Sequence, residues 1–163
     1  MFITVGAKLD MKFSDLKSLK GVEKMGDEFK DNSKEYKELL TQAIRRGLRT
    51  IGMRAETHAK ENCPVDTGYA SNSITYALSG EPADTSSYKA NIGKNGEPPK
   101  TGEYRGTLGK IEDNYVAIGS NVEYFPFIEE GARGRQALHV LRKAATDHKD
   151  EYKQLLTDSI KNA

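Results

Sequence analysis

Residues 33–64 read SKEYKELLTQAIRRGLRTIGMRAETHAKENCP, the longest amphipathic segment of the chain. Its apolar residues recur at every third or fourth position, which places them on one face of a single long helix. Asn32 or Ser33 can cap the first turn, and Glu35 follows Asn32 at the spacing of a capping box. Pro64 disfavours helical geometry at the residue before it, so the predicted helix covers residues 33–62. Its apolar stripe comprises Tyr36, Leu40, Ala43, Ile44, Gly47, Leu48, Ile51, Ala55 and Ala59.

The chain changes character directly after this helix. Pro64-Val-Asp-Thr-Gly68 is a turn sequence, because proline fixes φ, Asp66 can accept backbone N–H groups ahead of it and glycine tolerates positive φ. Ile74, Tyr76 and Leu78 then alternate with small or polar residues, as in a half-buried strand. Strand character returns at residues 115–118. Between these strands, residues 79–106 are rich in Gly, Pro, Ser and Lys, which predicts a long exposed loop or hairpin with room for a strand at 88–92.

The two ends of the chain carry further amphipathic segments. Residues 1–13 alternate in the manner of a strand or an arm, and residues 14–26 predict a short helix. A second long helix is predicted from about Gln136, with a stripe that runs through Leu141, His148 and Tyr152. We therefore expect an α+β fold, with two long helices packed on one face of a small antiparallel sheet. The expected plan is a single domain over residues 1–163: an N-terminal arm and short helix (1–32), a long helix (33–62), a β-sheet module (64–130) that contains the loop 79–106, and a C-terminal helix (136–162).

Composition limits the classes of protein that the chain can belong to. Of its 163 residues, 36% are apolar and 30% are charged, and the net charge of +1 argues against a dedicated nucleic-acid binder. A single cysteine excludes an intrachain disulfide and indicates a reducing compartment. No apolar run is long enough for a signal-peptide core or a membrane span, so the sequence predicts a protein that is soluble and cytoplasmic when synthesised.

No residue pattern indicates catalysis. His58, His139 and His148 lack the spacing of a zinc site, and core or boundary positions are expected for them. Cys63 lies at the wrong end of a helix for a lowered pKa, and Glu129 and Glu130 must point apart because they are adjacent. We therefore predict no catalytic, cofactor-binding or metal-binding residues, and a protein that is not an enzyme.

One basic strip leaves an alternative open. Arg45, Arg46, Arg49 and Arg54 lie together on the long helix. The strip is either a solvated helix face or a surface for an acidic partner or DNA phosphates. A nucleic-acid-binding or nuclease-like domain is therefore the alternative hypothesis, which salt-dependent retention on DNA would support.

Three segments resemble a known family. Pro64-Val-Asp-Thr-Gly-Tyr-Ala-Ser-Asn-Ser-Ile74 is similar to Pro-x-Asp-Thr-Gly-x-Leu-x-x-Ser-Ile; Val116–Gly119 with Tyr124–Gly131 is similar to Val-x-Val-Gly followed by Tyr-Ala-x-x-Val-Glu-x-Gly; and Leu141–Ala144 is similar to Leu-x-Pro-Ala. In this order, the motifs resemble the neck or tail-completion (head–tail joining) proteins of long-tailed, lambdoid-type bacteriophages. The chain departs from the family pattern at Ala70, Phe125, Ala132 and Lys143.

The resemblance implies a structural virion protein of the phage neck that is made in the host cytoplasm. It implies a closed ring of six copies that joins a head-side connector or stopper protein to the tail tube or tail terminator protein. DNA would pass through this ring without sequence-specific binding, and no cofactor or membrane is involved. The heterologous contacts that close such rings need exposed surface, for which the apolar residues Tyr124, Phe125, Phe127 and Ile128 are the candidates.

Charge distribution suggests which part of the chain faces the DNA. Residues 64–130 carry 5 basic and 10 acidic side chains, whereas the segments on either side are each net positive. A passage for DNA should not bind phosphates firmly, so we expect the sheet module to line the channel; the alternative is that its acids only keep the surface soluble. The candidate lining residues are Glu81, Asp84, Glu97, Glu103, Glu112 and Asp113.

Overall fold

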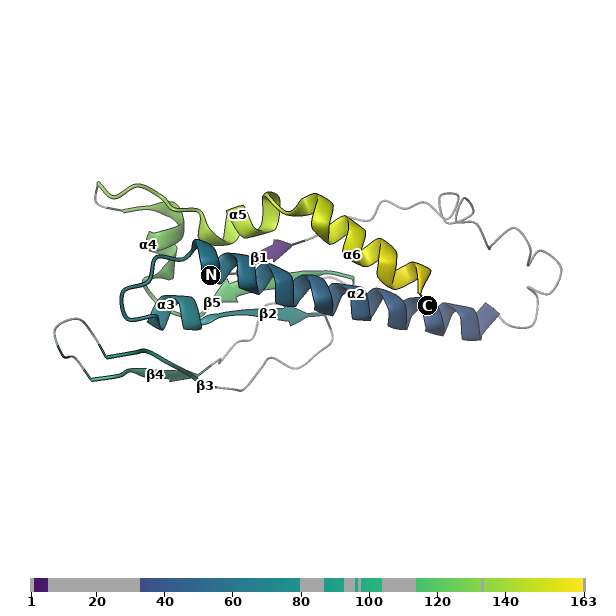
Figure 1. Cartoon of the computed structure of the whole chain (residues 1–163), viewed down its shortest axis with the longest axis horizontal. Helices are drawn as coiled ribbons and strands as arrows, with labels where there is room; N and C mark the ends of the chain where they lie inside the picture. The colour runs from purple at the N-terminus through teal and green to yellow at the C-terminus, as the bar shows by residue number, and fades with distance from the viewer. Residues whose placement is uncertain are drawn as a thin grey trace.

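The computed structural model describes residues 2–5, 33–79, 87–92, 96, 98–103, 114–132 and 134–162. Helix α2 (Ser33–Asn62) runs along the long axis of the molecule and coincides with the range predicted from the sequence (Figure 1). Its stripe is buried at Ala43, Leu48, Ile51, Ala55 and Ala59. Gly47 lies where a Cβ would come within 2.8 Å of Leu156 Cδ1, so its missing side chain lets the C-terminal helix approach closely.

The main sheet has three antiparallel strands in the order β1 (Phe2–Val5), β5 (Val116–Ser120), β2 (Ile74–Leu78). The central strand β5 is buried at every residue, and Ile118 is paired in register with Ile3 of β1 and with Tyr76 of β2. Helix α2 packs on β2 and β5, and α5 (Val140–Thr146) packs on β1 and α2. The predicted α+β fold is thus confirmed. The expected helix at 14–26 lies outside the described residues.

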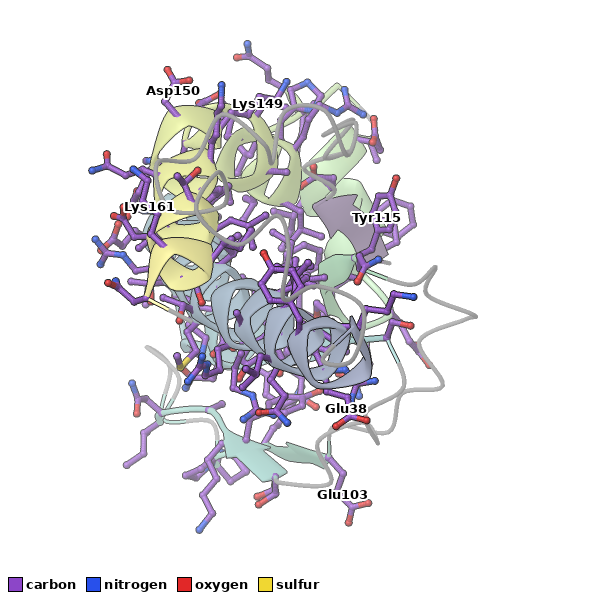
Figure 2. The ribbon with its side chains drawn as sticks, turned by 90° about the vertical axis from the view of Figure 1, so that its right-hand side faces the viewer. Glu38, Glu103, Tyr115, Lys149, Asp150 and Lys161 are labelled. Carbon is purple, nitrogen blue, oxygen red and sulfur yellow. The ribbon has the colours of Figure 1, made fainter. Side chains whose placement is uncertain are left out.

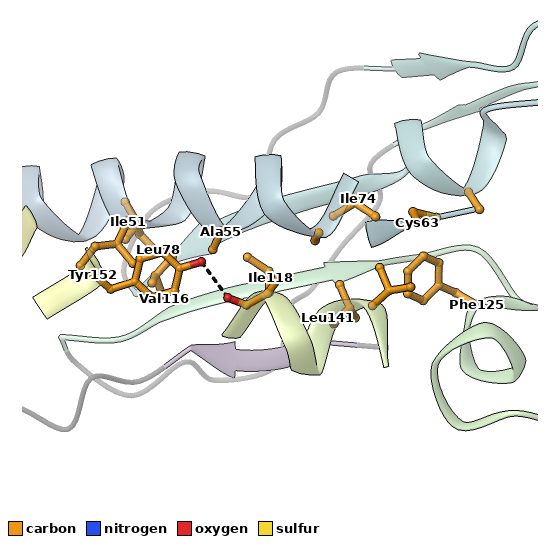
Figure 3. Packing of buried hydrophobic residues seen from close by; sticks show 14 of the residues in the cluster. Ile51, Ala55, Cys63, Ile74, Leu78, Val116, Ile118, Phe125, Leu141 and Tyr152 are labelled. Carbon is orange, nitrogen blue, oxygen red and sulfur yellow. Dashed lines mark hydrogen bonds between the residues drawn. The ribbon is translucent and has the colours of Figure 1, made fainter. Parts of the chain in front are cut away.

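The core lies between this sheet and the helices. Figure 3 shows Ile51 and Ala55 of α2 above Ile118 and Val116 of β5, and Leu141 of α5 belongs to the same cluster. Tyr152 is buried among them, and its hydroxyl donates a hydrogen bond of 2.7 Å to the Ala144 carbonyl oxygen. In the described part of the chain, no helix is long and apolar enough to cross a membrane.

The C-terminal helix differs from the prediction at its start and in its middle. Residues 136–139 are not helical, and His139 is left-handed with φ 53°. The helix then divides into α5 and α6 (Lys149–Lys161), because His148 leaves helical geometry at φ −111° and ψ 22°. The apolar stripe continues across this break, so periodicity alone does not reveal it.

The segment predicted as a loop or hairpin forms a hairpin where it is described. Strands β3 (Ser87–Lys89) and β4 (Thr101–Glu103) pair antiparallel as a second sheet. Tyr88 is buried, and its hydroxyl donates to Asn121 Oδ1 at 2.8 Å. The Asn121 amide donates in turn to the Glu103 carbonyl oxygen at 2.6 Å, so the hairpin is tied to the end of β5.

Candidate subunit-contact surface

An apolar hollow of about 720 Å³ lies beside α4 (Phe125–Glu130), at the end of the molecule where α2 ends (Figure 1). Three of its side chains are large, apolar and exposed: Tyr124 (44%), Phe127 (63%) and Leu138 (39%). Apolar side chains that are exposed together in one patch commonly mark a surface that another protein covers. The residues that line the apolar hollow are Pro64, Tyr124, Phe127, Ile128, Ala132, Arg135, Gln136 and Leu138.

Local sequence explains how α4 presents these side chains. Pro126 lies in the first turn, where its missing N–H costs nothing. Phe125 and Glu129, one turn apart, point inward and are fully buried, whereas Phe127 points outward. Gly131 then takes φ 76°, and a Cβ there would come within 2.6 Å of the Arg135 carbonyl oxygen. Only glycine fits this turn, after which Ala132, Arg135, Gln136 and Leu138 line the hollow.

The predicted contact residues divide between the surface and the core. Tyr124, Phe127 and Ile128 line the hollow. The predicted contact role is wrong for Phe125, because its side chain is 0% exposed and belongs to the core. In a helix, positions 125 and 127 face opposite sides. Leu138 and Pro64 were missed because they reach the hollow from other segments, and no short-range pattern links them to Tyr124.

The hollow is electrically neutral at its apolar wall. Burial raises the pKa of Tyr124, and the neighbouring Tyr69 and Cys63 raise it further. Burial likewise raises the pKa of the Cys63 thiol to about 11. Both groups are therefore uncharged near neutral pH, and Arg135 supplies the only formal charge among the described residues that line the hollow. Such a wall favours an apolar partner surface.

The charged residues predicted to meet DNA or a partner are only partly described. Glu103 lies on β4, is exposed, and points away from the body of the molecule (Figure 2). Glu81, Asp84, Glu97, Glu112 and Asp113 lie outside the described residues. In the basic strip, Arg45, Arg46 and Arg49 are exposed on α2. The fourth member, Arg54, is exposed as well, and its Nε donates a hydrogen bond of 2.8 Å to Glu151 Oε1.

Two histidines expected at separate boundary positions come together. His58 of α2 and His148, between α5 and α6, have parallel rings whose centroids are 3.5 Å apart. Glu151 Oε2 lies 3.0 Å from His58 Nε2, and hydrogen bonds from His58 and then Arg54 lower the pKa of this carboxyl group. The His148-x-x-Glu151 spacing was visible in the sequence, but the packing of α6 against α2 was not.

A second group of possible ligands is already used by the fold. Glu129, Glu130 and His139 also lie close together. Both carboxylate oxygens of Glu129 accept backbone N–H groups, from Leu141 at 2.8 Å and from Arg142 at 2.9 Å. Glu130 accepts from the Arg142 guanidinium. These acids stabilise the start of α5.

Tyr124, Phe127 and Leu138 gather in one exposed apolar patch beside α4, which is typical of a surface that binds another protein. Comparison with protein families gives the same answer: the model described as "Bacteriophage HK97-gp10, putative tail-component" matches residues 27–131, more than half of the chain. The chain belongs to this family and is a structural protein of a phage virion. No curated protein and no solved structure matches it significantly. The predicted resemblance to head–tail joining proteins is thereby confirmed at the level of the family.

Proposed function

We propose that this protein is a ring-forming subunit of the phage neck, which joins the head-side connector or stopper to the tail tube or tail terminator. The observation that carries the proposal is the apolar hollow, because three large apolar side chains are exposed together at one end of α4. In a head-to-tail ring, the hollow of one copy receives a different surface of the next copy. The ring of six copies and the passage of DNA are inferences from the family resemblance.

The hollow carries both apolar side chains that can contact a neighbour and polar side chains beside them. Phe127 and Tyr124 supply rigid aromatic anchors, the kind of side chain that contributes most to binding at protein interfaces. Arg135 and Gln136 lie at the same hollow and can pair with polar groups of the neighbour. Assembly at this surface needs no covalent chemistry.

The experiment compares charge at the hollow with charge at another exposed apolar position. A phage genome that lacks this gene is complemented with a gene for the Phe127→Glu variant or for the Met53→Glu variant. Met53 lies on α2 and its side chain is 49% exposed. Neither change disturbs the core, so thermal unfolding should shift little in either variant. We expect Phe127→Glu to leave heads and tails unjoined in electron micrographs and to abolish plaques, because a charge in a buried contact is costly.

The control variant Met53→Glu should give joined particles and near-normal titres. Normal joining by a folded Phe127→Glu protein would show that the hollow is not an assembly contact. Failure of both variants would indicate that the contact extends along α2.

A further inference from the structure

Two imidazole groups and one carboxylate converge from separate elements on the side of the molecule where α6 crosses α2. His58 Nε2 and His148 Nδ1 lie 3.0 and 3.7 Å from the same oxygen, Glu151 Oε2. Their candidate ligand atoms all lie within 4.8 Å of one another. The three side chains are 14%, 34% and 30% exposed, so the group is partly desolvated but still open to water.

The surroundings of His58 favour a cation at this point. On the other side of its ring, Nδ1 faces Glu61 Oε2 at 3.6 Å. Glu61 thus adds a second carboxylate close to the imidazole, and a metal-binding histidine commonly has a carboxylate beside its other nitrogen. Toward Glu151 Oε2, 3.0 Å away, His58 Nε2 is the donor of a hydrogen bond, and a metal ion bound at this point would take the place of that proton between the two atoms.

We propose that His58, His148 and Glu151 bind a divalent transition-metal ion, with zinc as the ion that suits them best. A tetrahedral zinc site with bonds of about 2.0–2.1 Å separates its ligand atoms by about 3.3–3.4 Å. The distances from Glu151 Oε2 to His58 Nε2, 3.0 Å, and to His148 Nδ1, 3.7 Å, lie just below and just above that value. Two nitrogens and one carboxylate oxygen are a usual ligand set for zinc, and solvent can supply the fourth ligand.

One adjustment is required. An imidazole binds a metal in the plane of its ring, and these two rings are parallel with an interplanar angle of 1°. One ring must therefore tilt. His148 can do so more easily, because it lies at the non-helical joint between α5 and α6, whereas His58 lies within α2. Arg54 holds Glu151 Oε1 and leaves Oε2 for the ion.

Zinc at this site would join α2 to the start of α6. The three ligands come together only in the folded chain, so zinc should bind the folded state and not the unfolded state. Zinc should therefore raise the free energy of unfolding once the zinc concentration exceeds the dissociation constant. The role is structural, and it is independent of the apolar hollow at the other side of α5.

The test uses tag-free, full-length protein stripped with a chelator and titrated with zinc chloride in a calorimeter. We expect one zinc per chain, a zinc-dependent rise in melting temperature, and a cobalt spectrum of four-coordinate type when Co²⁺ replaces zinc. His148→Ala and Glu151→Gln should weaken zinc binding at least about tenfold. Asp150→Asn is the matched control: it lies next to Glu151 but is exposed and points away from the body (Figure 2), so it should bind zinc as the wild type does.

Two further outcomes decide the matter. Cys63→Ser should bind zinc normally, which excludes the thiol as the ligand. His148 is one-third exposed, so its alanine variant should remain folded by circular dichroism and its zinc affinity can be measured directly. The proposal is overturned if the wild type shows no heat and no melting shift with zinc, or if folded His148→Ala binds zinc as tightly as the wild type.

Discussion

Cys63 is placed where its thiol is protected from ionisation. It is 4% exposed at the end of α2, and its Sγ lies 3.8 Å from the Pro64 carbonyl oxygen. Burial raises the pKa of the thiol from 9.0 to about 11. Because the thiolate is the reactive form, this cysteine should behave as a small core residue and not as a nucleophile.

We predict slow modification of Cys63. At pH 8 a thiol with a pKa near 11 has about 100-fold less thiolate than one with a pKa near 9, so a thiol reagent should react at least that much more slowly in the native than in the unfolded protein. Native reactivity equal to that of the unfolded chain at pH 8 would contradict this prediction.

The raised pKa of the Cys63 thiol also makes the stability of the protein depend on pH. The buried thiol contributes its full stability below pH 9, and this contribution is lost as the pH rises through about 11. The free energy of unfolding of the wild type and of Cys63→Ser, compared between pH 8 and pH 11, measures this loss.

Single residues also show what the sequence could and could not reveal. The aromatic surplus at 124–128 is visible in the sequence, but the sequence alone does not show which of these side chains reach the surface. Phe125 turned inward because α4 is a helix, and a six-residue helix leaves too few turns for its period to be recognised. His58 and His148 were missed as a pair because they are distant in the chain, and their contact depends on how α6 packs.

At the scale of elements, α5 depends on a cap from another helix. Glu129 of α4 is fully buried, and its carboxylate accepts the backbone N–H groups of Leu141 and Arg142. These groups have no partner within the helix, and the negative charge also interacts favourably with the positive end of the helix dipole. The cap fixes the start of α5 at Val140, several residues later than the apolar stripe predicts.

We predict that Glu129→Ala lowers the free energy of unfolding by about 2–4 kcal/mol, because two buried N–H groups lose their acceptor. The neighbouring Glu130→Ala removes only an exposed ion pair with Arg142 and should cost less than about 1 kcal/mol. Urea denaturation of both variants measures the difference. Equal losses would show that the cap does not stabilise α5 as we infer.

The elements differ in how far the sequence specifies them. Helix α2 was predictable to its last residue because its stripe is long and Pro64 stops it. Strands β2 and β5 were recognised from their apolar character, but the pairing of β1 with β5 joins opposite parts of the chain and follows from the tertiary fold. The break between α5 and α6 is a local departure at His148 within a continuous stripe.

At the scale of the whole molecule, the β3–β4 hairpin lies toward the same end as α4 (Figure 1), whose residues Phe127 and Ile128 line the apolar hollow. Asn121 binds Tyr88 and the Glu103 carbonyl oxygen and lies just before α4, which connects the two regions. The exposed arginines of α2 belong to a different element. A subunit built this way can make a neighbour contact with the hollow while the hairpin meets another component.

We predict that the hairpin faces the DNA channel. If so, Glu103→Lys should leave heads and tails joined but slow the release of DNA, because a positive side chain on each copy attracts passing phosphates. Arg46→Glu, a charge reversal at another exposed position, on α2, should leave release unchanged. The measurement is the rate of DNA ejection from purified particles, followed by dye fluorescence at two salt concentrations. The slowing by Glu103→Lys should diminish at high salt because screening shortens the reach of the charge. Ejection that depends on Arg46 and not on Glu103 would place α2, and not the hairpin, at the channel.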